Sequence, residues 1–286
     1  MSRSALVAML VAVEVLIVGM AVYVVRGACA MHHADYTAAA IAPVDAGAAP
    51  RITVDDVDSR VVVAASHDGL VHVKDLTSAH GAFFGERPSF AKLDVKRIPG
   101  GVAIARSESH GVRFQIGWSE QRVEIDAPAG SQLEIAHCAG AQVNGIEGGV
   151  AIMSQDGRIE LADVSGTVRA HSDDGRIVLT NVAASTLDAQ TKSGSIEAHN
   201  LSVAGGAPRA VLHTDDGSIR VALAAGADLT VDASTNDGHV IVNGESYTNS
   251  GDGDSAQHTV RLGNGSGSLQ LSSDDGSIHL TTNGAV

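Results

Sequence analysis

The stretch HSDDGRIVL, residues 171–179, and its near copy SSDDGSIHL, residues 272–280, decide the fold. Each places an Asp-Asp-Gly corner before a segment in which apolar and polar residues alternate. Alternation with a period of two is typical of a β-strand with one buried face. The same pattern recurs around Gly69, Gly157, Gly175, Gly194, Gly217, Gly238 and Gly276. The chain therefore repeats one unit, which we interpret as strand, corner, strand.

The positions around each glycine are as regular as the glycine itself. Residues two and four places after it are apolar in every copy, and so are residues five and seven places before it. The third residue before it is always a hydroxyl residue: Ser66, Ser154, Ser172, Thr191, Thr214, Thr235 and Ser273. By alternation these hydroxyls point inward, so we expect them to form internal hydrogen-bond ladders. The glycine is available for a positive φ at the corner.

The spacing of the corners indicates a stack of repeats. Successive glycines from Gly157 to Gly238 are 18, 19, 23 and 21 residues apart, and the step to Gly276 is 38. We interpret that long step as two units, the middle copy being blurred by the polar insertion at 246–257. A period near 20 predicts a parallel β-solenoid of roughly 12 coils over residues 51–286. Because Asp-Gly is also a hairpin signal, an antiparallel sandwich is the alternative. The solenoid is favoured because identical positions stack in ladders.

Residues 75–131 are less regular and hold all four Phe and the only Trp. We expect irregular N-terminal coils whose aromatic side chains plug that end of the column, because solenoids need distinct caps. An aromatic ligand platform is the alternative.

The amino terminus is predicted to anchor the protein in a membrane. Residues 5–25 form an apolar run, and at a 1.5 Å rise they reach about 30 Å, enough to cross a bilayer core. We therefore expect a cytoplasmic tip and transmembrane helix at 1–26, a flexible linker at 27–50 and an extracytoplasmic domain at 51–286. A cleaved signal peptide is the rival interpretation, since ACA at 28–30 suits a cleavage site.

One segment carries a family resemblance. Residues 123–179 have a V-x-I-x-A-P-x-G lead-in followed by repeated strands that start from Asp-Gly corners. This pattern resembles the bacterial putative-adhesin family of β-strand-repeat, DUF-type domains, and the likeness extends over about residues 60–282. The resemblance implies a right-handed parallel β-helix, an envelope location and an adhesive or scaffolding role. It supplies no catalytic residues.

The chemistry-bearing residues point away from catalysis. A net charge of −14 excludes a typical nucleic-acid binder, which needs cations for phosphates. The pairs Asp173-Asp174, Asp215-Asp216 and Asp274-Asp275 all occupy the corner position, whereas an active site should interrupt the repeat. Calcium binding by this row of acids, or by NSGDGDS at 249–255, is the alternative. We assign no catalytic, cofactor-binding or metal-ligating residue, and Cys29 and Cys138 show no metal-site spacing.

The sequence thus predicts a membrane-anchored, extracytoplasmic, non-catalytic β-solenoid. Its outward faces would bind a cell-surface glycan or an envelope protein. The alternatives are a polysaccharide-acting β-helix enzyme and a self-associating structural or regulatory envelope protein. An exposed last coil at HLTTNGAV, residues 279–286, would favour self-association, because a bare edge strand templates pairing.

Overall fold

The computed structural model describes residues 41–56, 59–84, 92–106, 114–203, 209–247 and 255–282. These residues are all β and divide into two compact units. One contains a two-stranded antiparallel sheet, β4 (Ser78–Phe84) with β7 (Phe114–Glu120). The other contains the remaining strands. Nowhere in the described part of the chain is there a helix of the length and hydropathy that a membrane span requires. The span predicted at 5–25 lies outside these residues.

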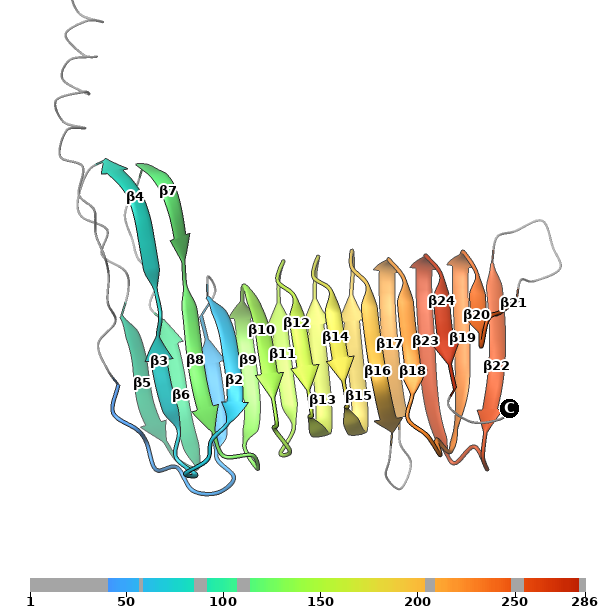
Figure 1. Ribbon diagram of the computed structural model, residues 1–286, viewed down its shortest axis with the longest axis horizontal. Coiled ribbons are helices and arrows are strands. Elements are labelled where there is room, and N and C mark those ends of the chain that lie inside the picture. The colour runs from blue at the N-terminus through green and yellow to red at the C-terminus, as the bar shows by residue number, and fades with distance from the viewer. Residues whose placement is uncertain are drawn as a thin grey trace, which may run out of the picture. The chain divides into compact units, whose positions relative to one another are not determined.

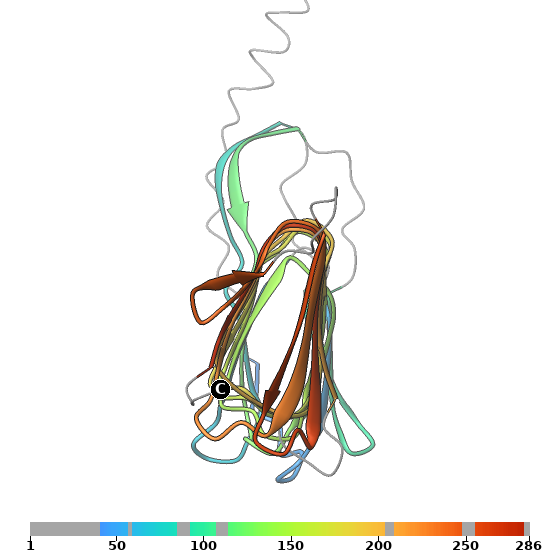
Figure 2. The ribbon, with the colours of Figure 1, turned by 90° about the vertical axis from the view of Figure 1, so that its right-hand side faces the viewer.

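The larger unit is a column with two parallel sheets as its walls (Figures 1 and 2). The first sheet includes β11 (Val150–Ser154), β13 (Ser165–Ser172), β15 (Ala183–Thr191) and β17 (Arg209–Asp216). The second includes β12 (Ile159–Ala162), β14 (Ile177–Thr180), β16 (Ile196–Val203) and β18 (Ile219–Leu223). A corner glycine joins the two strands of each of these four coils.

Register confirms the repeat inferred from the glycines. Val150 pairs with Val168, Val168 with Leu187, and Leu187 with Ala210, all in parallel. Equivalent residues therefore stack on one another from coil to coil, as in a β-solenoid and not as in an antiparallel sandwich. The core is made of buried Val, Ile, Leu and Ala side chains from both sheets.

The order of coils in the column differs from their order in the chain. The first coil consists of β1 (Arg51–Asp55) and β2 (Arg60–Ala65). On one side it pairs with β6 (Gly101–Arg106) and β8 (Arg122–Ala127). On the other side it pairs with β9 (Gln132–Cys138) and β10 (Gly140–Asn144). The last, β23 (Gly267–Asp275) and β24 (Ile278–Thr281), lies between β17 with β18 and β19 (Leu229–Asp237) with β20 (Val240–Val242) (Figure 1). The described part of residues 279–286 is therefore not an exposed last coil, the feature that would favour self-association.

Antiparallel strands form both ends of the column. At one end β5 (Leu93–Ile98) pairs with β6, and β3 (His72–Asp75) pairs with β8. At the other end β21 (Glu245–Tyr247) pairs with β20, and β22 (Ala256–Leu262) pairs with β19. The strands on either side of residues 248–254, β21 and β22, thus form an antiparallel cap where a parallel coil was expected.

Four of the aromatic residues expected to plug the N-terminal end of the column lie on β4 and β7, in the smaller unit: Phe83, Phe84, Phe114 and Trp118. Phe90 lies outside the described residues, and the aromatic plug stays a prediction. At the end of the column formed by β21 and β22, the rings of Tyr247 and His258 stack with centroids 3.6 Å apart. This stack joins β21 of one sheet to β22 of the other.

One of the seven sequence copies is not a coil. The corner at Gly69 joins β2 to β3, and both of these strands belong to the second sheet. Val61 and Val63 are buried there, whereas the copy predicted inward Val62 and Ala64. The sequence around Gly69 matches the repeat only by coincidence. Strand β2 belongs to the second sheet, whereas the strands that precede the other six corner glycines belong to the first sheet.

The other six hydroxyl residues are buried, as predicted. Each donates to a backbone carbonyl of the neighbouring coil; Thr191 Oγ1 lies 3.0 Å from Gly175 O, and Thr214 Oγ1 lies 2.8 Å from Gly194 O. Gly69, Gly238 and Gly276 have the positive φ expected at the corner, with values of 74°, 149° and 154°, whereas Gly157, Gly175, Gly194 and Gly217 do not. Stacking gives the second reason for glycine. A Cβ on Gly194 would lie 2.4 Å from Gly175 O, and one on Gly217 would lie 2.0 Å from Gly194 O. Stacked backbones leave no room for a side chain.

A second ladder was missed by the sequence reasoning. Asp163, Asn181 and Asn200 each follow a corner glycine by six residues and have φ of 53°, 53° and 57°. Asn and Asp tolerate this left-handed conformation best among residues with a side chain. Asn181 Nδ2 donates to Asp163 Oδ1 at 2.9 Å, and Asn200 Nδ2 donates to Asn181 Oδ1 at 3.0 Å. The spacing of six was the available signal.

Part of the predicted linker packs on the column. Val44 and Val71 form an isolated antiparallel bridge, with N–O distances of 2.9 and 3.0 Å. Ile41, Val44 and Ala46 pack against the core. The larger unit therefore includes residues before Arg51.

Candidate binding surface

The outer face of the second sheet neutralises its own charges. Arg122 Nη2 lies 2.8 Å from Glu124 Oε1, and Arg158 Nε lies 2.8 Å from Glu160 Oε1. Glu197 is within 4 Å of both Arg176 and Arg220. Such exposed pairs add little stability. They do leave this face with few uncompensated cations or anions for a ligand.

The outer face of the first sheet is arranged differently. Across neighbouring strands, Glu134, Ala151, Arg169 and Asp188 stand in one row, each the register partner of the next. Among the described residues, Arg169 and Arg209 form no ion pair with an acid. Both arginines are exposed. This face therefore offers guanidinium groups that the protein itself does not satisfy.

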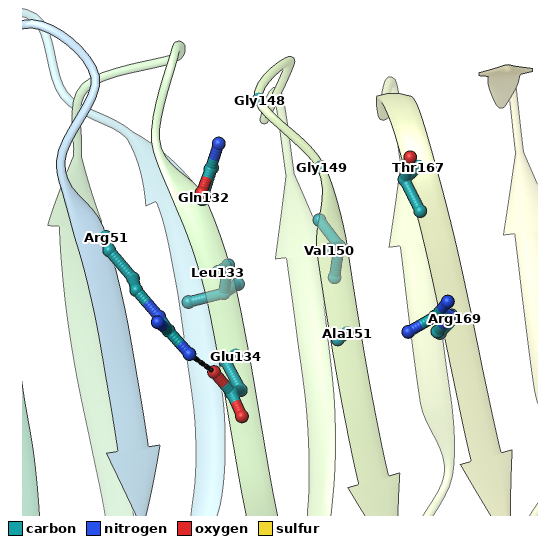
Figure 3. A pocket seen from close by; sticks show the side chains of 10 residues that line it. All are labelled: Arg51, Gln132, Leu133, Glu134, Gly148, Gly149, Val150, Ala151, Thr167 and Arg169. Carbon is teal, nitrogen blue, oxygen red and sulfur yellow. Dashed lines mark hydrogen bonds and ion pairs between the residues drawn. The ribbon is translucent and has the colours of Figure 1, made fainter. Parts of the chain in front are cut away.

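A hollow of about 320 Å³ lies on this face, over β1, β9, β11 and β13 (Figure 3). It exists because the coil that contains β11 has almost no side chains there: Gly148, Gly149 and Ala151 form its floor. Gly148 is required by packing, since a Cβ on it would lie 2.2 Å from Gly130 O. A constraint of stacking thus creates the depression.

The walls of the hollow carry polar groups from the two flanking coils. Arg51, Gln132 and Glu134 lie on one side, and Thr167 and Arg169 lie on the other (Figure 3). Glu134 and Arg169 flank Ala151 in register, so their strands are about 10 Å apart, two strand spacings. The hollow thus sets a carboxylate, an amide, a hydroxyl and guanidinium groups around a floor of small side chains.

The two arginines of the hollow differ in whether an acid among the described residues pairs with them. Arg51 Nη2 lies 2.5 Å from Glu134 Oε2, with side chains 61% and 50% exposed, so water screens this pair. Arg169 has no such partner and can offer its planar fork to a carboxylate, a geometry that gives two parallel charge-assisted hydrogen bonds. The lining contains one carboxylate and neither His nor Cys. It is suited to holding a polar ligand.

A second hollow, also about 320 Å³, lies at the end of the column formed by β21 and β22, and Tyr247 and His258 are among its lining residues. Its polar groups are already engaged within the protein. Tyr247 Oη donates to Glu245 Oε2 at 3.1 Å, which raises the pKa of Tyr247, and Arg261 donates to the carbonyl of Asn264. We therefore rank it below the hollow at Arg169.

The predicted acidic corners are exposed or half-exposed, and one acid of each pair has a side-chain partner. Lys192 Nζ lies 2.6 Å from Asp173, His213 Nε2 lies 2.9 Å from Asp215, and Asn236 Nδ2 donates to Asp274 at 3.0 Å. Within the described ranges no group of three or more His, Cys, Asp or Glu is placed to hold a metal. The 249–255 segment lies outside them except for Ser255. Cys138 is buried, which raises its pKa.

A buried ion triad escaped the sequence reasoning. Arg106 donates to Asp75 through both Nη atoms, at 3.0 and 2.9 Å, and to Asp56 through Nε at 3.0 Å. These side chains are at most 5% exposed. Burial raises the pKa of Asp56, and the bond from Arg106 opposes that rise. The triad joins the ends of β1, β3 and β6.

Comparison with known proteins gives one family and two similar structures. The model of the Toastrack DUF4097 family matches residues 50–281. A "putative cell adhesion protein" from Clostridium sporogenes is 12% identical, with 86% of this chain and 97% of that chain covered and a TM-score of 0.35. A "putative adhesin" from Bacteroides fragilis is 12% identical, with 88% and 96% covered and a TM-score of 0.27. No curated protein matches.

Proposed function

Because the chain belongs to the Toastrack DUF4097 family, we propose that it is a non-catalytic binding protein of the adhesion type. In this proposal residues 5–25 anchor it in the cell membrane and the column lies outside the cytoplasm. The hollow beside Arg169 binds a surface polysaccharide that carries carboxylates. Family membership agrees with the resemblance seen at residues 123–179.

The observation that carries the proposal is the position of Arg169. It is an exposed arginine at the edge of a hollow, and no acid in the described part of the chain pairs with it, whereas the opposite face of the column pairs its own charges. An arginine fork favours a carboxylate. Gln132, Thr167 and Glu134 add the donors and acceptors that sugar hydroxyls require.

The orientation in the membrane rests on the charges beside the apolar run. Arg3 and the terminal amine precede it and Arg26 follows it, which gives a small bias toward a cytoplasmic amino terminus. The column would then face the exterior, where polysaccharides are found. Accessibility of a C-terminal tag to protease on intact cells tests this part independently of binding.

Binding is tested with the full chain reconstituted in lipid nanodiscs, against a polyuronate and its carboxyl-reduced counterpart. Arg169→Gln should weaken polyuronate binding about 10- to 100-fold, the equivalent of one charge-assisted hydrogen-bond pair. Arg209→Gln, on the same face but outside the hollow, is the matched control and should bind like the wild type.

A second pair of variants tests the shape of the hollow. Ala151→Tyr fills its floor from an outward position and should abolish binding, whereas Val211→Tyr makes the same kind of change in the same outward row and should not. Equal binding by the wild type and Ala151→Tyr would overturn the placement of the ligand. Equal affinity for the carboxyl-reduced polysaccharide would overturn its chemistry.

A further inference from the structure

The first coil and the last described coil along the chain both lie inside the stack and not at its ends. The coil β1–β2 has parallel partners on both sides in both sheets, and so has the coil β23–β24. The outermost strands, β3, β5, β21 and β22, all come from the interior of the chain. The ends of the chain are thus not the ends of the column.

Hydrogen bonds also hold the points where the chain enters and leaves the stack, from both neighbouring coils at the entry and from Asn243 at the exit. Arg51 N donates to Gly100 O at 2.9 Å, while Pro50 O accepts from Gln132 N at 2.9 Å. At the other terminus Asn243 Nδ2 donates to Thr282 Oγ1, and Thr282 N donates to Asn243 Oδ1, each at 2.9 Å. Asn243 adopts φ of 50°, which turns its amide toward this segment.

This arrangement affects how the column unfolds when force is applied to the termini. In a solenoid stacked in chain order, each terminal coil has one neighbour, so it frays first and unfolding proceeds from the end. Here a pull on the amino terminus first opens the short Val44–Val71 bridge. The coil that it then reaches, like the coil reached from the carboxyl side, must break two ladders in each sheet before it moves. The singly paired strands, which would open most easily, are not connected directly to either terminus.

We propose that the column bears tension between its amino and carboxyl termini, and that it resists stepwise peeling under load. This is a function in addition to ligand binding, and it does not depend on the proposed ligand. Resistance to force is set by the unfolding rate rather than by equilibrium stability. Trapping the terminal coils removes the low-barrier route.

The test is single-molecule force spectroscopy on the full chain, with no ligand present. Handles at the two termini should give no step of one coil, about 70 Å for roughly 20 residues, before the main rupture. A handle moved from the carboxyl terminus to Thr259, on the singly paired strand β22, is the matched control. It should give an early low-force release of the cap.

The expected result is therefore a clear dependence on where the force is applied in one and the same protein. A staircase of coil-sized steps under terminal load would overturn the proposal. So would equal first-rupture forces for the two attachments. Neither result would bear on polysaccharide binding, which is measured without force, so the two proposals fail separately.

Discussion

Replacing Arg106 with Met should destabilise the larger unit severely. The substitution removes three charge-assisted hydrogen bonds of 2.9 to 3.0 Å and leaves Asp56 and Asp75, 1% and 4% exposed, without their cation. Breaking a buried ion pair on one side costs about 3–5 kcal/mol, mainly because the remaining charge stays buried. Since natural domains are stable by about 5–15 kcal/mol, this is a large fraction of the total.

The free energy of unfolding in urea measures this cost, and its pH dependence identifies the cause. The pKa of Asp56 is raised in the folded protein, so the folded state binds its proton more tightly than the unfolded state does. The stability from this group is complete below pH 3.8 and is lost as the pH rises through the raised pKa. Without Arg106 the carboxyls resist ionisation further, so the deficit of Arg106→Met should shrink toward acidic pH.

The triple variant Arg106→Met, Asp56→Asn, Asp75→Asn is the control. It removes all three charges and should recover most of the lost stability, because an uncharged replacement of a buried ion cluster is often neutral. A loss below about 1 kcal/mol for Arg106→Met would refute the reasoning. A deficit that does not change between pH 7 and pH 4 would refute it as well.

The remaining predictions concern the ladders and the corners. Gly194→Ala should destabilise by more than Gly226→Ala in urea unfolding, because a Cβ on Gly194 meets Gly175 O at 2.4 Å, whereas Gly226 faces open space and its substitution costs only the strain of a φ of 77°; equal losses would contradict the stacking explanation. Thr214→Val removes a buried 2.8 Å hydrogen bond and should cost about 1 kcal/mol; an unchanged midpoint would show that the hydroxyl ladder is dispensable. Millimolar Ca²⁺ should leave the thermal midpoint unchanged, since the corner acids have Lys192, His213 and Asn236 as partners; a raised midpoint would reveal metal sites there.

The repeat unit could be predicted because it is local. Corner glycine, inward hydroxyl and alternating apolar residues lie within a dozen residues, and each has a physical role within one coil. The order of coils could not be predicted, because every coil presents the same ladder positions to its neighbours. Nothing in residues 267–281 indicates whether their coil stacks beyond the coil of β19 or between the coils of β17 and β19, where the structure has it.

The candidate site was hidden for a related reason. It is made by missing side chains at Gly148, Gly149 and Ala151, and their absence matters only once the flanking coils are in register. The Asp56–Asp75–Arg106 triad likewise joins residues 19 to 50 positions apart with no shared spacing. The corner at Gly69 is an error of the opposite kind. Its local pattern predicts a crossing from one sheet to the other, but the chain continues within the second sheet.

The proposed binding of a carboxylated polysaccharide by Arg169 is tested most directly by a double-mutant cycle. Affinities are measured for the wild type and Arg169→Gln with a uronate oligosaccharide and its carboxyl-reduced form. The account predicts that the wild type prefers the uronate at least about tenfold, close to 1.4 kcal/mol, and that the preference disappears in Arg169→Gln. An undiminished preference in Arg169→Gln would show that the carboxylate is recognised elsewhere and would contradict the account.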